Sequence, residues 1–237
     1  MSPNLTNRWA PDKIARATGG AYLGFILASV IADVLGHIGR GTTLQVRQAI
    51  VTNIESFRLA LVIAFISAFL FLVTAWGLYV LLRPVNEELA LLFLLLNAVG
   101  VTIQCASMLP LISAMLQGDG ASHMQAYSAV QLQGLAYLSI NVYKTGFVAA
   151  QLFFGTWLFP LGYLVYKSRF LPKFLGILLI LDGIGEGIWF LQAMLLPTHP
   201  TIHMPGTVVS FVAEVALALW LLIKGLQPVD SRTVVPG

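Results

Sequence analysis

The chain has 237 residues, of which 58% are hydrophobic and only 10% are charged. Soluble domains usually contain about 45–50% apolar and about 25% charged residues, so the composition excludes an ordinary soluble fold. The formal net charge of +3 does not indicate nucleic-acid binding, because no basic stripe with interleaved aromatic residues is present. Cys105 is the single cysteine, so neither an intrachain disulfide nor a paired-cysteine metal site is expected.

Six apolar segments are long enough to cross a membrane as helices. About 20 apolar residues span a hydrocarbon core about 30 Å thick, and helices are the spanning elements that leave no backbone group without a partner in lipid. The expected spans are residues 14–38, 57–82, 89–116, 142–167, 172–196 and 206–224. The sequence therefore predicts an all-α, polytopic membrane helix bundle. This bundle forms one domain over residues 1–237, with short tails at about 1–13 and 225–237.

Residues 122–141 are the uncertain part of this topology. They include Ser122, Gln131, Gln133 and Asn141, and they are more polar than a membrane span tolerates. We interpret them as a surface helix or as a re-entrant segment leading into the fourth span. A seventh crossing in this stretch is the alternative.

The distribution of basic residues predicts the orientation. With six spans, one side of the membrane carries Arg8, Lys13, Arg16, Arg83, Lys167, Arg169, Lys173, Lys224 and Arg232. The other side carries only Arg40, Arg47 and Arg58. Basic residues concentrate in cytoplasmic loops, so both termini and both tails are predicted to be cytoplasmic.

Three passages carry a family resemblance. They are residues 82–86 (Leu-Arg-Pro-Val-Asn), residues 153–164 from Phe-Phe-Gly to Gly-Tyr-Leu, and residues 167–176 (Lys-Ser-Arg-Phe-Leu-Pro-Lys-Phe-Leu-Gly). Together with Glu214 and the Leu-Trp-Leu-Leu of 219–222, they resemble the bacterial integral membrane proteins grouped as domain-of-unknown-function family 4386. The resemblance runs from about Ala15 to Gly225 and implies the fold, the topology and a bacterial inner-membrane location. It implies no activity.

Ionisable residues inside the expected spans indicate function, because they are costly in lipid. They are Asp33, Lys144, Asp182, Glu186 and Glu214. Asp182, Glu186 and Trp189 follow i, i+4, i+7 spacing and share one helix face. One lysine cannot neutralise four acids, so we expect more than structural pairing between helices.

These residues predict a polar, acidic cavity in the outer half of the bundle, open toward the periplasm. The expected ligand-binding residues are Asp33, His37, Gln104, Lys144, Asp182, Glu186, Trp189 and Glu214. If the protein is an enzyme, the candidate catalytic residues are Asp182, Glu186 and Glu214.

No metal site and no cofactor are predicted. His37, His123, His199 and His203 all fall on the expected outer side. A site using them with Asp33 is conceivable, but prolines make the 197–205 stretch a loop without helical spacing. The glycines of residues 183–187 do not form a dinucleotide-binding loop; Gly183 and Gly187 instead predict close packing of a neighbouring helix.

Three functions remain open at this point. The first is binding or transport of a small amphiphile or cation in the acidic cavity. The second is an intramembrane enzyme that uses carboxylate acid–base chemistry on a lipid-soluble, for example isoprenoid-like, substrate. The third is an accessory subunit of a membrane complex. Expected partners are membrane lipids and such a ligand, with a homo-oligomer or a complex partner left open and no nucleic acid.

Overall fold

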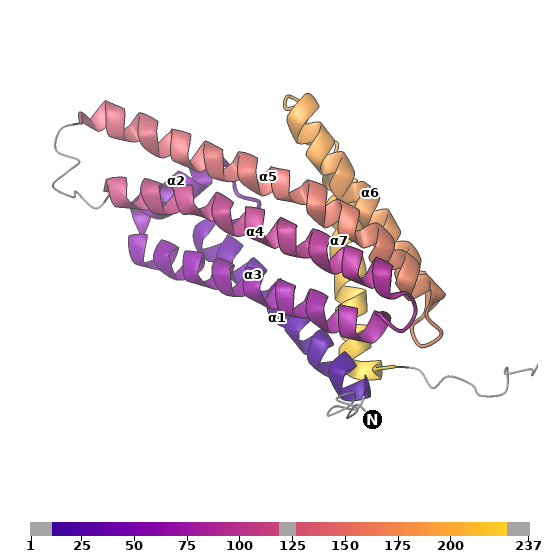
Figure 1. Ribbon diagram of the computed structural model, residues 1–237. Coiled ribbons are helices and arrows are strands. Elements are labelled where there is room, and N and C mark those ends of the chain that lie inside the picture. Colours follow the sequence, from indigo (N-terminus) through magenta and orange to yellow (C-terminus); the bar gives the residue numbers. More distant parts are fainter. Residues whose placement is uncertain (1–10, 119–126, 227–237) are drawn as a thin grey trace, which may run out of the picture.

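The helical prediction is confirmed. The computed structural model describes residues 11–118 and 127–226, and every regular element in these two stretches is a helix. The elements are α1 (Pro11–Gly36), α2 (Thr43–Thr52), α3 (Ile54–Leu82), α4 (Glu87–Gly118), α5 (Ala129–Lys167), α6 (Lys173–Leu195), α7 (Met204–Leu219) and a π-helical turn, η2 (Trp220–Lys224). Figure 1 shows α1, α3, α4 and α5 running in similar directions, with α6 and α7 set at an angle to them.

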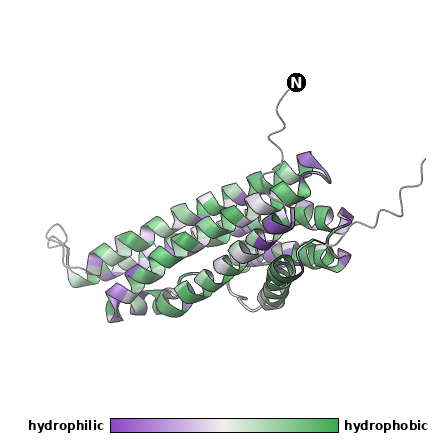
Figure 2. Ribbon diagram, turned by 90° about the horizontal axis from the view of Figure 1, so that it is seen from below, coloured by the Kyte–Doolittle hydropathy of each residue, from purple (hydrophilic) through white to green (hydrophobic). Residues whose placement is uncertain are grey.

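Six of these helices are long and apolar enough to cross a membrane, as expected. They are α1, α3, α4, α5, α6 and the continuous stretch formed by α7 and η2. Hydrophobic residues cover most of their length, while hydrophilic residues concentrate near the helix ends (Figure 2). The protein is therefore a multi-pass membrane protein, because only a lipid environment accommodates so much outward-facing apolar surface.

The polar stretch before the fourth span belongs to a helix that also crosses. Residues 129–141 are the first part of α5, which has 39 residues and is continuous to Lys167. At about 1.5 Å per residue such a helix is nearly twice as long as the hydrocarbon core is thick. Its polar start therefore extends beyond the core, and the described part of the stretch adds no seventh crossing. Residues 122–126 lie outside the described residues.

The short helix α2 was not predicted from the sequence. Thr42 and Gln45 form a capping box at its start, and Val46 and Ile50 are buried beneath it. Its polar side chains contact α5, since Thr43 donates a hydrogen bond to Asn141 (2.8 Å). Arg47 likewise donates to the Tyr137 hydroxyl (3.2 Å). These contacts explain why the start of α5 is polar yet ordered as a helix.

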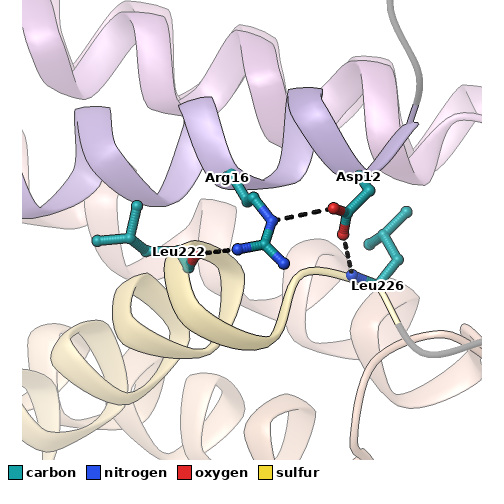
Figure 3. Close-up of polar contacts among 4 residues, drawn as sticks. All are labelled: Asp12, Arg16, Leu222 and Leu226. Carbon is teal, nitrogen blue, oxygen red and sulfur yellow. Dashed lines mark hydrogen bonds and ion pairs between the residues drawn. The ribbon is translucent and has the colours of Figure 1, made fainter.

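The two ends of the described chain meet at one end of the bundle (Figure 3). Arg16 pairs with Asp12 at 2.9 Å and also donates to the carbonyl of Leu222 (3.4 Å). Asp12 in turn accepts a hydrogen bond from the backbone of Leu226 (3.3 Å). Both described ends thus lie at the same end of the bundle, and the cytoplasmic location of that end stays a prediction from the distribution of basic residues. The predicted tails fall mostly in residues 1–10 and 227–237, outside the described residues.

Glycines allow α6 to approach both of its neighbours closely. A Cβ at Gly183 would lie 2.9 Å from the carbonyl oxygen of Gly155 on α5, and one at Gly185 would lie 2.9 Å from Cα of Gly206 on α7. The packing prediction is therefore confirmed at Gly183. At Gly187 it is only partly right, because the backbone nitrogen lies near Gly155 while a Cβ at Gly187 itself would meet no atom within 4 Å.

Candidate ligand-binding cavity

One cavity of about 300 Å³ lies between the helices, on the side of the bundle away from the termini. It is lined by residues of α1, α3, α4, α5, α6 and α7 and by the loop that follows α1. The segments that line it are the second half of α1, the middle of α3, α4 and α5, residues 182–189 of α6 and residues 210–214 of α7. This position is the outer half of the bundle for a protein whose termini are cytoplasmic.

Four carboxylates form a polar wall of this cavity. Asp33 comes from α1, Asp182 and Glu186 from α6, and Glu214 from α7. Asp182 and Glu186 face the cavity together because they are four residues apart on one helix. Asp182 is completely buried, with 0% of its surface exposed. Asp33, Glu186 and Glu214 are partly buried.

The oxygens of these carboxylates have few protein partners. Neither carboxylate oxygen of Asp182 has a hydrogen-bond partner among the described residues, nor do Oδ1 of Asp33 and Oε2 of Glu186. Ser210, one turn before Glu214 on α7, lies beside Asp182 and Glu186. A buried polar group without a partner is expensive, so the wall has hydrogen-bonding and charge-pairing capacity that the protein itself does not use.

Aromatic rings form another wall of this cavity. Phe25 and Phe71 stack with ring centroids 4.3 Å apart, and Phe71 meets Trp157 edge-on at 5.3 Å. Phe154 also packs against Phe71, at 5.2 Å. All four residues line the cavity. The cavity lining therefore combines carboxylates with aromatic rings.

Arg40 is the basic residue that lines this cavity, and sequence reasoning placed it only in an outer loop. Among the described residues the salt bridges are Arg16–Asp12 and Arg58–Glu55, so Arg40 forms no ion pair with a cavity carboxylate there. Its positive charge acts on Glu186 and Glu214 through space instead. Gly39, with φ of 120°, and Gly41 flank it. A signal for this turn was present in the His-Ile-Gly-Arg-Gly sequence, but glycines alone do not reveal where the arginine side chain lies.

The structure does not bring Lys144 to the cavity. Lys144 instead donates a hydrogen bond to the carbonyl of Gly41. The neighbouring Tyr143 hydroxyl accepts a hydrogen bond from the backbone nitrogen of Gly39 (2.7 Å). Both residues of α5 therefore hold the turn that positions Arg40. Spacing along α5 could not show this, because the contact joins residues about a hundred positions apart.

His37 is also absent from the residues that line this cavity. It adopts a left-handed backbone conformation, with φ of 54°, directly after α1. His37 lines a separate hollow beside Gln45 of α2 and Asn53, the residue between α2 and α3. Because α1 ends at Gly36, His37 does not continue the helix face that carries Asp33.

Of the remaining expected residues, Gln104 and Trp189 line the cavity with the four acids. Trp189 stacks on His203, with ring centroids 5.3 Å apart, and His203 shares a 3.0 Å hydrogen bond with Gln192. Burial and then the positive charge of Arg40 lower the pKa of His203, which favours its neutral form at neutral pH. The structure thus places this loop histidine against the tryptophan of the cavity wall.

No group of three or more His, Cys, Asp or Glu residues is close enough to hold a metal ion in the described parts of the chain. Asp33 and the outer histidines are therefore not brought together as metal ligands there, and His123 lies outside those parts.

The chain belongs to the family named Domain of unknown function (DUF4386), which matches residues 17–225, from within the first span to the end of the sixth. The resemblance noted in the sequence is thereby confirmed. The chain is also 29% identical over 178 residues to an archaeal relative, an "Uncharacterized protein" of Archaeoglobus fulgidus; the match covers 73% of this chain and 88% of that protein. No solved structure matches the chain.

Proposed function

We propose that this protein binds a small organic cation, or an amphiphile with a cationic head, in the acidic cavity, and carries it within or across the membrane. One observation supports this above all others. Four carboxylates from three helices line one cavity of about 300 Å³ together with aromatic rings.

The balance of charge supports a cationic ligand. Arg40 is the basic residue among those that line the cavity, against Asp33, Asp182, Glu186 and Glu214. Placing a charged residue at the centre of a membrane helix costs about 2.5–3.5 kcal/mol. A bound cation would offset part of that cost, whereas an anion would add to it.

The aromatic wall supports an organic rather than a hydrated inorganic cation. Aromatic rings attract cations through their quadrupole, and cages of this kind recognise quaternary ammonium groups. Trp157 and Phe71 present their rings to the same space as the carboxylates. A volume near 300 Å³ is at the lower end of the range for small-molecule pockets, so the head of the ligand is small.

Location is part of the proposal. The basic residues favour cytoplasmic termini, and the cavity then lies in the periplasmic half of a bacterial inner membrane. Transport would use the unpaired carboxylates in turn as sites for the cation and for protons, which is the usual role of acids inside membrane spans.

The direct test is binding of tetramethylammonium to the full chain in lipid nanodiscs, measured by tryptophan fluorescence or calorimetry. We expect Glu186→Gln to weaken binding by about tenfold or more, which corresponds to about 1.4 kcal/mol. Glu88→Gln is the matched control, because Glu88 is exposed in the first turn of α4 at the cytoplasmic end. Equal affinities for both variants and the wild type would remove the proposed function.

Acid–base catalysis on a lipid-soluble substrate is the second candidate. The unpartnered oxygens of Asp182 and Glu186 favour it, since a carboxyl group in such a site can donate or accept a proton. Proteoliposome assays separate the two: transport predicts proton-coupled uptake of an unchanged cation, and catalysis predicts a chemically altered product.

A further inference from the structure

Three uncharged residues bring the cavity to the lipid-facing surface of the bundle. Val30 and Val34 of α1 and Phe211 of α7 line the cavity, yet they are 49%, 72% and 51% exposed. They lie within membrane spans, so the surface they expose faces lipid. The cavity therefore reaches the bilayer between the outer halves of α1 and α7.

The same two helices are tightly joined at their cytoplasmic ends. A Cβ at Gly19 of α1 would lie 2.7 Å from the carbonyl oxygen of Ala218 and 3.0 Å from the carbonyl carbon of Leu221. Figure 1 shows α1 and α7 diverging from this end. The opening between them is thus confined to the half of the membrane that contains the cavity.

The alternative route, from the outer aqueous side, is less suited to a cation. Arg40 lines that end of the cavity and is exposed. Its turn is fixed by Tyr143 and Lys144, so the positive charge stays near the entrance. A cation arriving from water meets a like charge, whereas one arriving between α1 and α7 passes Val30, Val34 and Phe211.

From this arrangement we infer that the ligand enters sideways from the bilayer, through the gap between the outer halves of α1 and α7. The inference rests on the proposed function and names its ligand class: an ammonium group carrying an alkyl chain. The ammonium lies among Asp182, Glu186 and Glu214, and the chain extends past Val34 and Phe211 into lipid. Electrostatic attraction supplies affinity for the head, and burial of the chain against Phe211 supplies affinity for the tail.

Two probes and one pair of variants test the route. The probes are octyltrimethylammonium, which partitions into lipid, and tetramethylammonium, which has no chain. Val34→Phe narrows the gap, and Val62→Phe makes the same change on α3 at a residue that is 55% exposed and does not line the cavity. Association is followed by stopped-flow tryptophan fluorescence with the full chain in nanodiscs.

We expect Val34→Phe to slow association of octyltrimethylammonium by about tenfold relative to Val62→Phe. The reason is that a narrower opening leaves fewer ligand orientations that can enter, which lowers the association rate constant. Tetramethylammonium should associate with both variants at the same rate. If Val34→Phe slows neither probe, or slows both equally, lateral entry is wrong while the cavity remains a cation site. Failure of the cavity itself would appear separately, as unchanged tetramethylammonium affinity in Glu186→Gln.

Discussion

The two halves of this bundle differ in whether their acidic side chains have partners within the protein. At the end where the two described termini meet, Asp12 is paired with Arg16 and also accepts a hydrogen bond from Leu226. In the outer half, Asp182 is fully buried and neither of its oxygens has a partner among the described residues. The first end is closed by its own contacts, and the second keeps an acidic cavity open.

Backbone packing shows the same contrast. Gly19 brings α1 against η2 so closely that a side chain there would meet backbone atoms, whereas a Cβ at Gly187, one residue from Glu186, would meet nothing within 4 Å. We therefore expect substitutions to affect stability most at the end where the termini meet, and to affect the proposed ligand binding most in the half that contains the cavity. Variants at each end test this division.

The largest effect is expected from placing a large side chain in the tight contact that Gly19 makes with the last helical segment. Gly19→Leu would force the new side chain against the Ala218 carbonyl, whose oxygen lies 2.7 Å from the position of a Cβ. Overpacking a tight contact lowers the free energy of unfolding by about 1–3 kcal/mol. Because the neighbouring atoms here belong to the backbone and cannot rotate away, we expect a loss at or above the upper end of that range. Thermal unfolding followed by size-exclusion fluorescence measures the loss.

Gly20→Leu is the control for that variant, because a Cβ at Gly20 would meet only the end of the Leu222 side chain, 3.9 Å away. Its melting temperature should stay close to that of the wild type. Equal destabilisation by both substitutions would show that the Gly19 contact has no special role.

The second prediction concerns the outer half, where function and stability should oppose each other. Asp182→Leu replaces a buried carboxyl without partners by an apolar group of similar size. Such a replacement of a buried charge is neutral or stabilising by about 1 kcal/mol or more. We expect an unchanged or higher melting temperature together with loss of tetramethylammonium binding. A large fall in melting temperature would mean that Asp182 is structural.

A smaller and opposite effect on affinity is expected at Arg40. Arg40→Gln removes the positive charge that lines the acidic cavity, so tetramethylammonium should bind about three- to tenfold more tightly, a typical gain for removing a like charge at an intermediate effective dielectric. Arg47→Gln is the control, since Arg47 contacts Tyr137 away from the cavity. Titrations at low and high salt should show the gain shrinking as salt screens the charge.

The smallest effect is expected at Lys144. Lys144→Met breaks the hydrogen bond to the Gly41 carbonyl and should cost about 1 kcal/mol of stability, the usual net contribution of one such bond. Lys144 does not line the cavity, and the Tyr143 hydroxyl would still accept the hydrogen bond from Gly39 that holds the Arg40 turn, so the affinity for tetramethylammonium should change by less than about twofold. A large loss of affinity would mean that Lys144 contributes to ligand binding after all.

These contrasts also explain how far the sequence reaches. The six spans follow from hydropathy, since the bilayer imposes long apolar segments directly on composition, and an even number of spans puts both described ends on one side. The gathering of Asp182, Glu186 and Trp189 follows from helical spacing. That Asp33, Glu214 and Gln104 line the same cavity agrees with their expected depth in the membrane.

What the sequence could not give depends on contacts between distant segments. The sequence predicted Lys144 as a cavity residue and did not predict Arg40 there, whereas in the structure Arg40 lines the cavity and Lys144 does not. The reason is that the turn after α1 is held to α5 by the hydrogen bond from Gly39 to Tyr143. The aromatic wall of Phe25, Phe71 and Trp157 comes from three helices, and no local pattern distinguishes those rings from ordinary packing residues. Helix α2 escaped prediction because ten residues are too few to give a membrane signal.

The central claim is tested most directly by a high-resolution density map of the full chain in nanodiscs saturated with octyltrimethylammonium. We predict density for the ammonium group between Glu186 and Glu214 on one side and the rings of Phe71 and Trp157 on the other, with the alkyl chain leaving between α1 and α7. A map in which these carboxylates turn away from one another, and side chains fill the space between them, would contradict the account.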